Sequence, residues 1–239
     1  MAAVIPAHVL SAFQLDGIEG RPLGGAWEFG TRFGRVVVAE AGDTSAWSGK
    51  AREKIGGGPR GLLRVARPVR ATDGRLIVGG FRADEFAEGE ARARIDETIA
   101  AALRYDDAAA DIPAPPAQRS GVRAAADRAV WRGFTPDSGD VVAHLDFLSH
   151  TLYDGDLPPF LTNILPSVDL RPRGYTAALV MVDGLLAGAV DNAVVDRWAH
   201  VPGIRELAAK ALEYRQECTD GTDSNAGANF ARVAGIVSV

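Results

Sequence analysis

Residues 141–170 read VVAHLDFLSHTLYDGDLPPFLTNILPSVDL and gather titratable, metal-capable side chains between apolar runs. His144 and Asp146 follow the apolar run 141–143, and a strand there would place both side chains on one face. Asp169 ends a second apolar run. If the two runs form a hairpin of strands, the Asp169 carboxylate would lie at the same end of the hairpin as His144 and Asp146. Paired carboxylates of this kind are typical of a divalent-metal site. We therefore interpret the rest of the chain as a scaffold around this stretch.

The composition predicts a globular protein without a nucleic-acid or membrane partner. A chain of 239 residues with 47% hydrophobic content is long enough for one large lobe or two small ones. The net charge of -5 disfavours binding to phosphate backbones or anionic lipids. Cys218 is the single cysteine, which excludes an internal disulfide and fits a reducing compartment. With no apolar run of about 20 residues and no basic leader, we expect a soluble cytoplasmic protein.

The first part of the chain has the pattern of a small antiparallel sheet with one helix. Residues 22–38 place glycines around alternating aromatic residues and then a β-branched run, which predicts a strand, a glycine-rich turn and a strand. Such glycines let backbone N–H groups approach a phosphate, although a tight hairpin alone also explains them. Residues 44–55 carry Trp47, Ala51 and Ile55 at helical spacing. Thr72-Asp73-Gly74 joins two further apolar runs as a hairpin turn.

A change from strand to helix periodicity near residue 85 predicts a lobe boundary there, with a sheet-rich lobe over 1–85 and a helical lobe over 86–239. Helical spacing of apolar residues predicts the helices of the second lobe. These helices cover residues 91–110, 122–131, 177–190 and 204–215. The tail from 219 to 239 has no strong pattern, and we predict no element for it.

This order of features resembles the aminoglycoside phosphotransferase and choline kinase branch of the protein-kinase-like fold. The shared features are the Gly-rich hairpin, the helix after it, His144-Leu145-Asp146 and, 169 − 146 = 23 residues later, Asp169 after an apolar run. Six segments are similar to uncharacterised actinobacterial proteins of that branch. They are PLGGAWEFG, AWSGKAREKI, RVARPVRATDGR, VGGFRADEFAEG, AADRAVW and VDRWAHVP. The resemblance implies an α+β, two-lobe fold with a small antiparallel sheet lobe and a helical lobe.

The resemblance also implies a phosphotransferase that uses Mg²⁺ and ATP on a small-molecule hydroxyl or amine. Asp146, together with His144, would belong to the catalytic loop and orient or deprotonate the acceptor, and Asp169 would hold Mg²⁺ on the nucleotide phosphates. The remaining implied residues contact the nucleotide. Gly24, Gly25 and Gly30 would cover its phosphates, and Gly80, Phe81 and Ala83 would line the adenine pocket through their backbone.

Three positions depart from the pattern of that branch. Thr151 stands five residues after Asp146, where the branch has a metal-binding Asn, and His150 or Asn163 are the candidate substitutes. The strand 36–40, VVVAE, has no phosphate-binding Lys, which leaves Glu53 of the following helix without an evident partner. Leu145 replaces the Gly that usually follows the His.

Three hypotheses therefore stay open. The first is a phosphotransferase that binds a nucleotide and a small-molecule acceptor. The second is a kinase-like fold without transfer chemistry, which senses a nucleotide or binds a protein. The third is a metal-dependent hydrolase, in which His144, Asp146 and His150, with Asp154 or Asp156, bind a metal that activates water. Arg171 and Arg173 are either a phosphate clamp or solvated loop residues.

Overall fold

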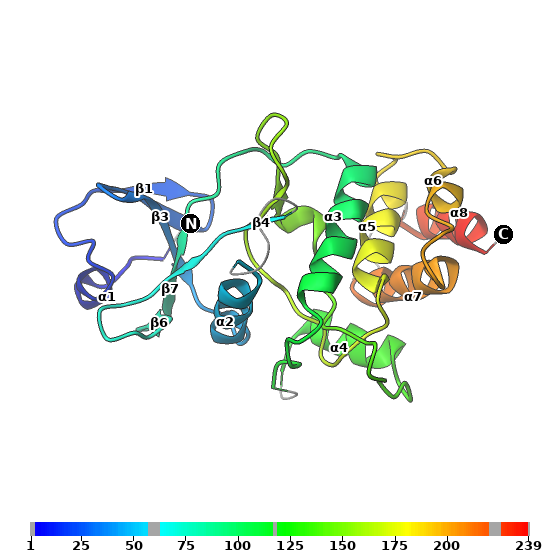
Figure 1. Ribbon diagram of the computed structural model, residues 1–239, viewed down its shortest axis with the longest axis horizontal. Coiled ribbons are helices and arrows are strands. Elements are labelled where there is room, and N and C mark those ends of the chain that lie inside the picture. Colours follow the sequence, from blue (N-terminus) through cyan, green and yellow to red (C-terminus); the bar gives the residue numbers. More distant parts are fainter. Residues whose placement is uncertain (1–2, 57–62, 117–118, 220–225, 239) are drawn as a thin grey trace. The chain divides into compact units, whose positions relative to one another are not determined.

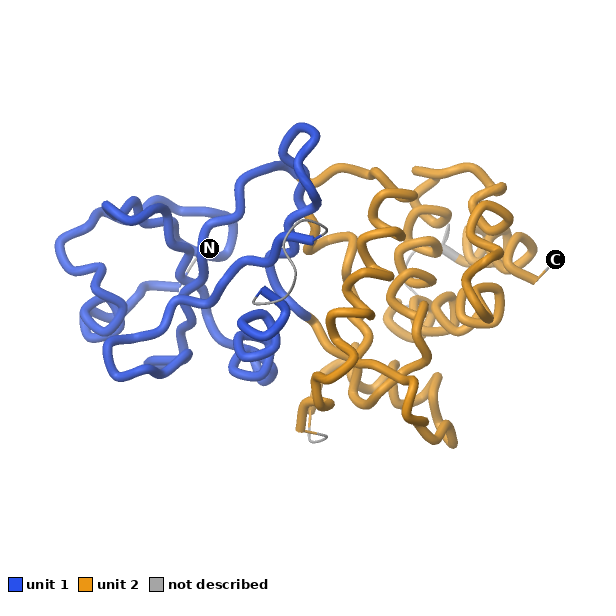
Figure 2. The backbone as a smooth tube through the Cα atoms, viewed as in Figure 1, with its two compact units in different colours: residues 1–90, 152–164 blue, residues 91–151, 165–239 orange. Residues whose placement is uncertain are grey.

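The computed structural model describes residues 3–56, 63–116, 119–219 and 226–238. The chain forms two compact units, and it passes between them three times (Figure 2). Unit 1 is made of Met1–Glu90 and Leu152–Ile164, and unit 2 of Ala91–Thr151 and Leu165–Val239. The first crossing lies five residues beyond the expected boundary at 85, and the return of residues 152–164 to unit 1 was not expected from the sequence.

Unit 1 is built on an antiparallel sheet of six described strands in the order β1-β2-β3-β7-β5, with β6 also paired to β7. The strands are β1 (Gly20–Leu23), β2 (Ala26–Thr31), β3 (Gly34–Glu40), β5 (Pro68–Val69), β6 (Ile77–Val78) and β7 (Phe81–Glu85) (Figure 1). The hairpin expected over 22–38 is therefore β2 and β3, with a second hairpin from β1. The runs around Thr72-Asp73-Gly74 do not pair with each other, because β5 and β6 both pair with β7.

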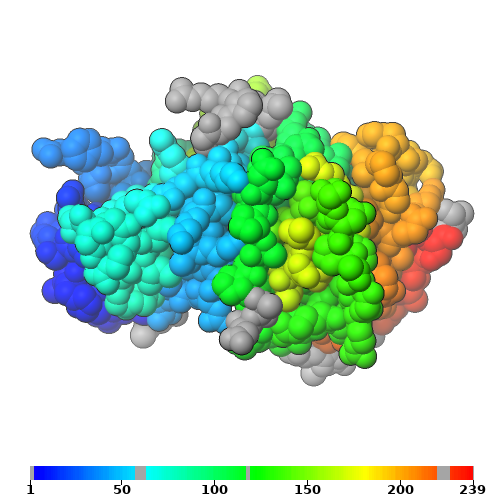
Figure 3. Space-filling view, turned by 60° about the horizontal axis from the view of Figure 1, so that its bottom comes forward, coloured from blue at the N-terminus to red at the C-terminus, as the bar shows by residue number. Residues whose placement is uncertain are grey.

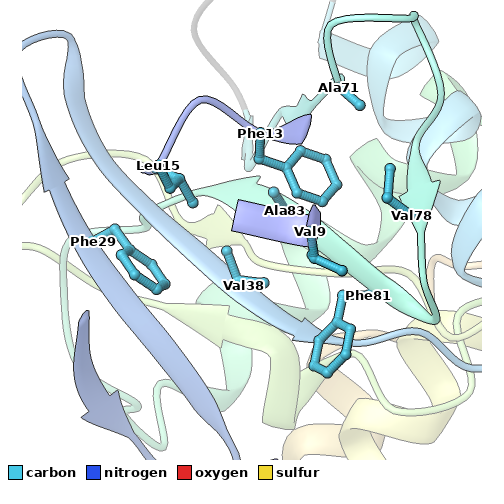
Figure 4. Packing of buried hydrophobic residues seen from close by; sticks show 9 residues of the cluster. All are labelled: Val9, Phe13, Leu15, Phe29, Val38, Ala71, Val78, Phe81 and Ala83. Carbon is cyan, nitrogen blue, oxygen red and sulfur yellow. The ribbon is translucent and has the colours of Figure 1, made fainter. Parts of the chain in front are cut away.

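One face of this sheet is apolar and is covered by the N-terminal segment. The helix α1 (Ala7–Ala12) and the residues after it contribute Val9, Phe13 and Leu15, which pack against Phe29, Val38, Phe81 and Ala83 of the strands (Figure 4). Strand residues two apart share a face, which explains why Val38, Phe81 and Ala83 meet in one core.

The other face of the sheet carries charged residues, one of which is bound by the second helix. Arg52 of α2 (Ser45–Gly56) reaches Asp84 of β7 at 2.6 Å, and Asp84 points away from the core residue Ala83. A second, three-stranded sheet of β4 (Arg64–Val65), β9 (Phe160–Leu161) and β8 (Thr151–Leu152) joins the returning segment to unit 1. Because β4 pairs with β9 in parallel across nearly 100 residues, no local turn signal predicts it.

Unit 2 is helical. Its helices are α3 (Ile95–Ala108), α4 (Val122–Val130), the 3-10 turn η1 (Leu148–His150), α5 (Tyr175–Leu186), α6 (Val194–Arg197), α7 (Ile204–Glu217) and α8 (Ala226–Val237). Ten of the twelve residues of α5 are buried, as its apolar sequence without a polar face predicts. On the face drawn in Figure 3, the yellow part of the chain, to which α5 belongs, emerges between green segments that precede it in the sequence.

The four helices expected in the second lobe correspond to α3, α4, α5 and α7. The helix α8 lies in the tail for which the sequence predicted no element, where Val233 and Val237 are buried and the Arg232 guanidinium donates to the Leu185 carbonyl at 2.6 Å. Among the described helices, none combines the length and the apolar character needed to cross a membrane.

Candidate functional site

His144 is fully buried in unit 2, in the loop 144–151 that holds the candidate catalytic residues. Its Nδ1 and Nε2 atoms lie 3.1 and 3.3 Å from the backbone nitrogens of Asp146 and Leu165. The ring also packs edge-on against Tyr105 and Phe147. His144 therefore ties the start of the loop to the chain segment that follows residue 164, and its ring is shielded from solvent.

A buried polar chain fixes the backbone of His144. Its N–H donates to Thr176 Oγ1 at 3.1 Å, and this hydroxyl donates to Asp106 Oδ1 at 2.8 Å. The other Asp106 oxygen accepts from the N–H of Gly174 at 2.8 Å. Burial raises the pKa of Asp106 to about 7, although both hydrogen bonds favour its charged form. Asp106 therefore connects α3 and the start of α5 to the candidate loop.

Asp146 has the accessible carboxylate of this loop. Its side chain is 18% exposed, and Oδ2 lies 3.4 Å from the mostly exposed Arg123 guanidinium. Arg215 of α7 donates to the Leu145 carbonyl at 3.0 Å, next to Asp146 in the chain. The same guanidinium is held by both carboxylate oxygens of Asp183 at 2.6 Å. Arg215 thus stabilises the backbone of the loop, while among the described residues the Asp146 carboxylate makes one long contact, to Arg123.

Asp146 and Asp169 lie on two chain segments that antiparallel bridges connect. The bridges pair Val141 with Arg171 and His144 with Pro166, and between them the N–H of Ser167 donates to the Ala143 carbonyl at 2.8 Å. Asp169 is exposed, and its Oδ1 accepts from the N–H of Leu170. That both carboxylates reach one metal ion therefore stays a prediction.

Thr151 is buried, and its hydroxyl donates to the Phe147 carbonyl at 2.8 Å, so it stabilises the turn and is not a free metal ligand. Of the two substitutes, His150 stacks near His144 with ring centroids 5.5 Å apart, and Asn163 Oδ1 accepts from Ser48 Oγ at 2.9 Å inside unit 1. Across the described ranges, no three His, Cys, Asp or Glu side chains gather closely enough to hold a metal ion. Among the described residues, the side chains suggested as ligands for the metal-dependent hydrolase therefore form no such group.

In unit 1, Gly24 and Gly25 form the two-residue turn that closes the β1–β2 hairpin, where Leu23 pairs with Ala26. Gly24 has φ +58°, which suits the first central position of a type II′ turn. Nothing lies within 4 Å of a Cβ added at Gly24, Gly25 or Gly30, and all three are exposed. Steric crowding therefore does not demand glycine at Gly25 or Gly30, while the open backbone remains accessible to a ligand.

The positions expected to line an adenine pocket are occupied by sheet pairing. Phe81 pairs with Glu40 and Val78, and Ala83 pairs with Val38 and Val69, so β7 has a neighbour along both edges. The Gly80 carbonyl accepts from the N–H of Ala41 at 2.7 Å. The backbone groups of Phe81 and Ala83 therefore lie within the ladders, and the role of Gly80, Phe81 and Ala83 in an adenine pocket stays a prediction.

The sheet face that carries Asp84 also contains Ala39, which lies directly opposite Arg82 in the β3–β7 ladder. Arg82 and Arg52 both bind the Asp84 carboxylate. Glu53, expected to lack a partner, forms a bidentate pair with Arg70 at 2.7 and 2.6 Å. Sequence analysis missed the group of Arg52, Arg82 and Asp84, although a strand over FRADE places Arg82 and Asp84 on one face.

Both loop arginines have a carboxylate partner, and Arg171 is buried. Arg171 is buried and forms a bidentate pair with Asp127 at 3.1 and 2.8 Å, below the Trp131 ring. Arg173 donates to Asp107 at 2.7 Å and to the Gly139 carbonyl at 3.1 Å. Asp127 also accepts from the N–H of Val168 at 2.6 Å, so Arg171 and Asp127 together fix the strand that leads to α5.

The sequence matches no protein-family profile and no curated protein. The fold, however, matches solved structures. A crystal structure of aminoglycoside phosphotransferase APH(4)-Ia has a TM-score of 0.55 at 13% identity, with 97% of this chain and 96% of that chain covered. A thermostable mutant of the same enzyme, in ternary complex with AMP-PNP and hygromycin B, has a TM-score of 0.54 at 12% identity, with 97% and 98% covered. The chain therefore has the α+β, kinase-like fold of these phosphotransferases.

Proposed function

We propose that this protein binds ATP and transfers a phosphoryl group to a hydroxyl or amine of a small molecule. The observation that carries the proposal is Asp146, an accessible carboxylate on a loop that a buried polar network holds rigidly. Phosphoryl transfer depends mainly on positioning and on charge stabilisation, and a carboxylate that orients the acceptor is one of its recurring parts. The neighbour with hygromycin B and AMP-PNP bound has the same fold, which supports a nucleotide and a small molecule as ligands.

In this proposal Asp146 accepts a hydrogen bond, and finally the proton, from the attacking acceptor group. Asp146 must be ionised for this role, and its carboxylate lies beside the Arg123 guanidinium. His144 is a positioning residue, since its buried ring nitrogens face the backbone of Asp146 and Leu165. Gly24, Gly25 and Gly30 offer accessible backbone to the phosphates.

Magnesium fits the described residues only in part. A nucleotide-bound Mg²⁺ needs one or two protein carboxylates, and most of its remaining ligands are phosphates and waters. Asp169, with its exposed carboxylate, stays the predicted ligand. We therefore assign no step of the transfer to the metal. A cytoplasmic location, where ATP is supplied, remains part of the proposal.

The second candidate is a kinase-like protein that binds a nucleotide or a partner without transferring phosphate. Two observations favour it. β3 contains no Lys, and Thr151 uses its hydroxyl within the loop instead of offering it to a metal. Loss of both groups would remove phosphate and metal contacts while leaving the fold intact.

The two candidates differ in what happens to bound ATP. We expect calorimetry of the full chain with Mg-ATP to give binding heat, and a sensitive assay to detect slow ATP hydrolysis with water as the acceptor. Asp146→Asn should keep the affinity for Mg-ATP and lower turnover by about 10² or more, the usual scale for loss of a general base. Asp156→Asn, which removes an exposed carboxylate in unit 1, is the matched control and should leave turnover unchanged.

Binding without hydrolysis in the wild type would favour the second candidate. An absence of binding heat at millimolar Mg-ATP would end the kinase assignment and leave only the fold. Equal turnover in the wild type and Asp146→Asn would remove the role given to Asp146.

A further inference from the structure

Two guanidinium groups share one carboxylate on the α2-facing side of the sheet in unit 1. Arg52 Nη2 lies 2.6 Å from Asp84 Oδ1, and Arg82 Nη1 contacts Asp84 Oδ2. The Arg52 side chain is 1% exposed and also donates to the Ala66 carbonyl at 2.7 Å. It is therefore buried and out of reach of a ligand in solution. Arg82 is 20% exposed. The group therefore carries one excess positive charge, and Arg82 is its accessible member.

Two neighbouring acidic side chains are paired with other arginines. Glu28 of β2 points to the same face but is bound to Arg35 at 3.0 Å. Glu53 of α2 is bound to Arg70. Burial lowers the pKa of Arg82, against the charge of Asp84, which raises it. The accessible part of the Arg82 guanidinium can bind an anion, and its planar shape matches a phosphate oxygen pair.

The sheet register places small side chains between Arg82 and the Gly24–Gly25 turn. Ala39 lies opposite Arg82, and because Trp27 pairs with Val38, the next residue pair across β2 and β3 is Ala26 with Ala39. Two alanines therefore separate Arg82 from the Gly24–Gly25 turn, since Ala26 follows that turn directly. A phosphate chain that lies across these two alanines would contact both Arg82 and the exposed backbone of the turn.

We propose that Arg82 binds a phosphate of the nucleotide, and so supplies from β7 the cation that β3 lacks. This inference rests on the proposed function, since it needs a nucleotide below the Gly24–Gly25 turn. In this arrangement Asp84 and Arg52 orient Arg82: Asp84 holds one edge of its guanidinium, and the buried Arg52 keeps Asp84 in place. The ligand class is a polyphosphate ester, and the adenosine part makes no contact with Arg82.

The test separates the phosphate contact from nucleotide binding as a whole. Calorimetry would compare Mg-ATP and adenosine as ligands of the full-length wild type, Arg82→Ala and Arg70→Ala. Loss of a charge-assisted contact should weaken Mg-ATP binding of Arg82→Ala roughly 10- to 100-fold, and should leave the adenosine affinity unchanged. Arg70→Ala is the matched control, because it also removes one arginine from a carboxylate pair in unit 1, and it should bind Mg-ATP like the wild type.

Two further variants guard against a folding artefact. Arg82→Gln keeps an N–H donor for Asp84 without the charge, and it should show the same selective loss of Mg-ATP binding. Ala39→Lys in the Arg82→Ala background places a cation on the facing strand residue, and it should restore part of the lost affinity.

Unchanged Mg-ATP affinity in Arg82→Ala and Arg82→Gln would overturn the role of Arg82 while the proposed function stands. An equal loss for Mg-ATP and adenosine would overturn it as well, because the effect would then lie outside the phosphates. A wild-type protein that binds neither ligand would overturn both this inference and the proposed function.

Discussion

Asp106 is fully enclosed in unit 2, and its two oxygens accept hydrogen bonds from Gly174 and Thr176. Burial raises the pKa of Asp106 to about 7 from the ordinary 3.8. Between these two pH values the folded protein therefore holds a proton that the unfolded chain has released. The contribution of Asp106 to stability is therefore complete below pH 3.8 and is lost as the pH rises towards 7. The residue that anchors the candidate loop thus also makes the fold sensitive to pH.

Replacement of Asp106 by Asn should remove this sensitivity. Between pH 5 and pH 7 the free energy of unfolding of the wild type should fall, relative to Asp106→Asn, by about 1.4 kcal/mol per pH unit. Denaturant titrations of both proteins at several pH values measure the difference. Asp107→Asn, a mostly exposed neighbour on the same helix, is the control. Parallel stability curves for the wild type and Asp106→Asn would show that Asp106 is ionised in the fold throughout.

At the same scale, the sequence indicates candidate residues but not the side chains that surround them in the fold. His144 and Asp146 do share one loop, but the sequence could not show that the His ring is enclosed by Tyr105 and Phe147. Asp169 was predicted to lie at the same end of the hairpin as His144 and Asp146, because an apolar run precedes it. The pairing of Val141 with Arg171 depends on side chains distant in sequence, such as Asp127, and no local pattern encodes it.

Among the elements, the helices could be predicted from the spacing of apolar residues, because the contacts that stabilise a helix repeat within one segment. The apolar spacing in 91–110 and 204–215 corresponds to α3 and α7, and the apolar run near 177–190 corresponds to the buried α5. The short strands were harder. β5, β6, β8 and β9 have two residues each, too few to show a period, and partners on other segments define them.

The contact of α3 with α5 depends on one glycine in the last turn of α5. A Cβ added at Gly184 would lie 2.8 to 3.0 Å from three side-chain carbons of Ile95, which is itself buried. These carbons include both branches at the Ile95 Cβ, so the clash is not relieved by moving a flexible chain end. Gly184 therefore lets the two helices approach closely.

Gly184→Ala should lower the free energy of unfolding by roughly 1–3 kcal/mol, the usual cost of overpacking a core. The control is Gly235→Ala in α8, where nothing lies within 4 Å of the added Cβ and the residue is exposed. There the better helix propensity of Ala should raise stability by about 0.5–1 kcal/mol. Denaturant unfolding of both variants and of the wild type measures these changes in the free energy of unfolding. Stabilisation by both would mean that α3 moves away from α5 at little cost.

At the scale of the whole molecule, the most consequential feature is the return of residues 152–164 to unit 1. This segment pairs β9 with β4, and Pro158 and Thr162 accept hydrogen bonds from Arg64 and Arg52. Unit 1 is therefore completed by residues that follow the candidate loop in sequence. A boundary placed at 85 from local periodicity cannot include this return, because the pattern of 152–164 alone does not indicate its distant partner.

Phe160 tests whether this segment is an integral part of unit 1. Its ring is 8% exposed, packs with Ala66 and Ala87, and lies 4.8 Å from the Arg64 guanidinium. Phe160→Ala should cost about 3–5 kcal/mol, as truncation of a buried aromatic residue does. Part of the cost should appear as faster amide hydrogen exchange in β4 and in residues 81–88, because loss of local packing opens the structure that it supports.

The comparison variant is Leu179→Ala in the fully buried middle of α5, which should speed exchange in the helices of unit 2 instead. Mass-spectrometric hydrogen exchange on the full chain resolves both patterns by segment. If Phe160→Ala speeds exchange equally in β4 and in α5, the two units open together as one cooperative structure. If it speeds exchange only in 152–164, the segment is peripheral. Faster exchange in unit 1 alone would mean that residues 152–164 belong to the fold of unit 1. The strand β9, which follows the candidate loop in the sequence, would then be an integral part of that unit.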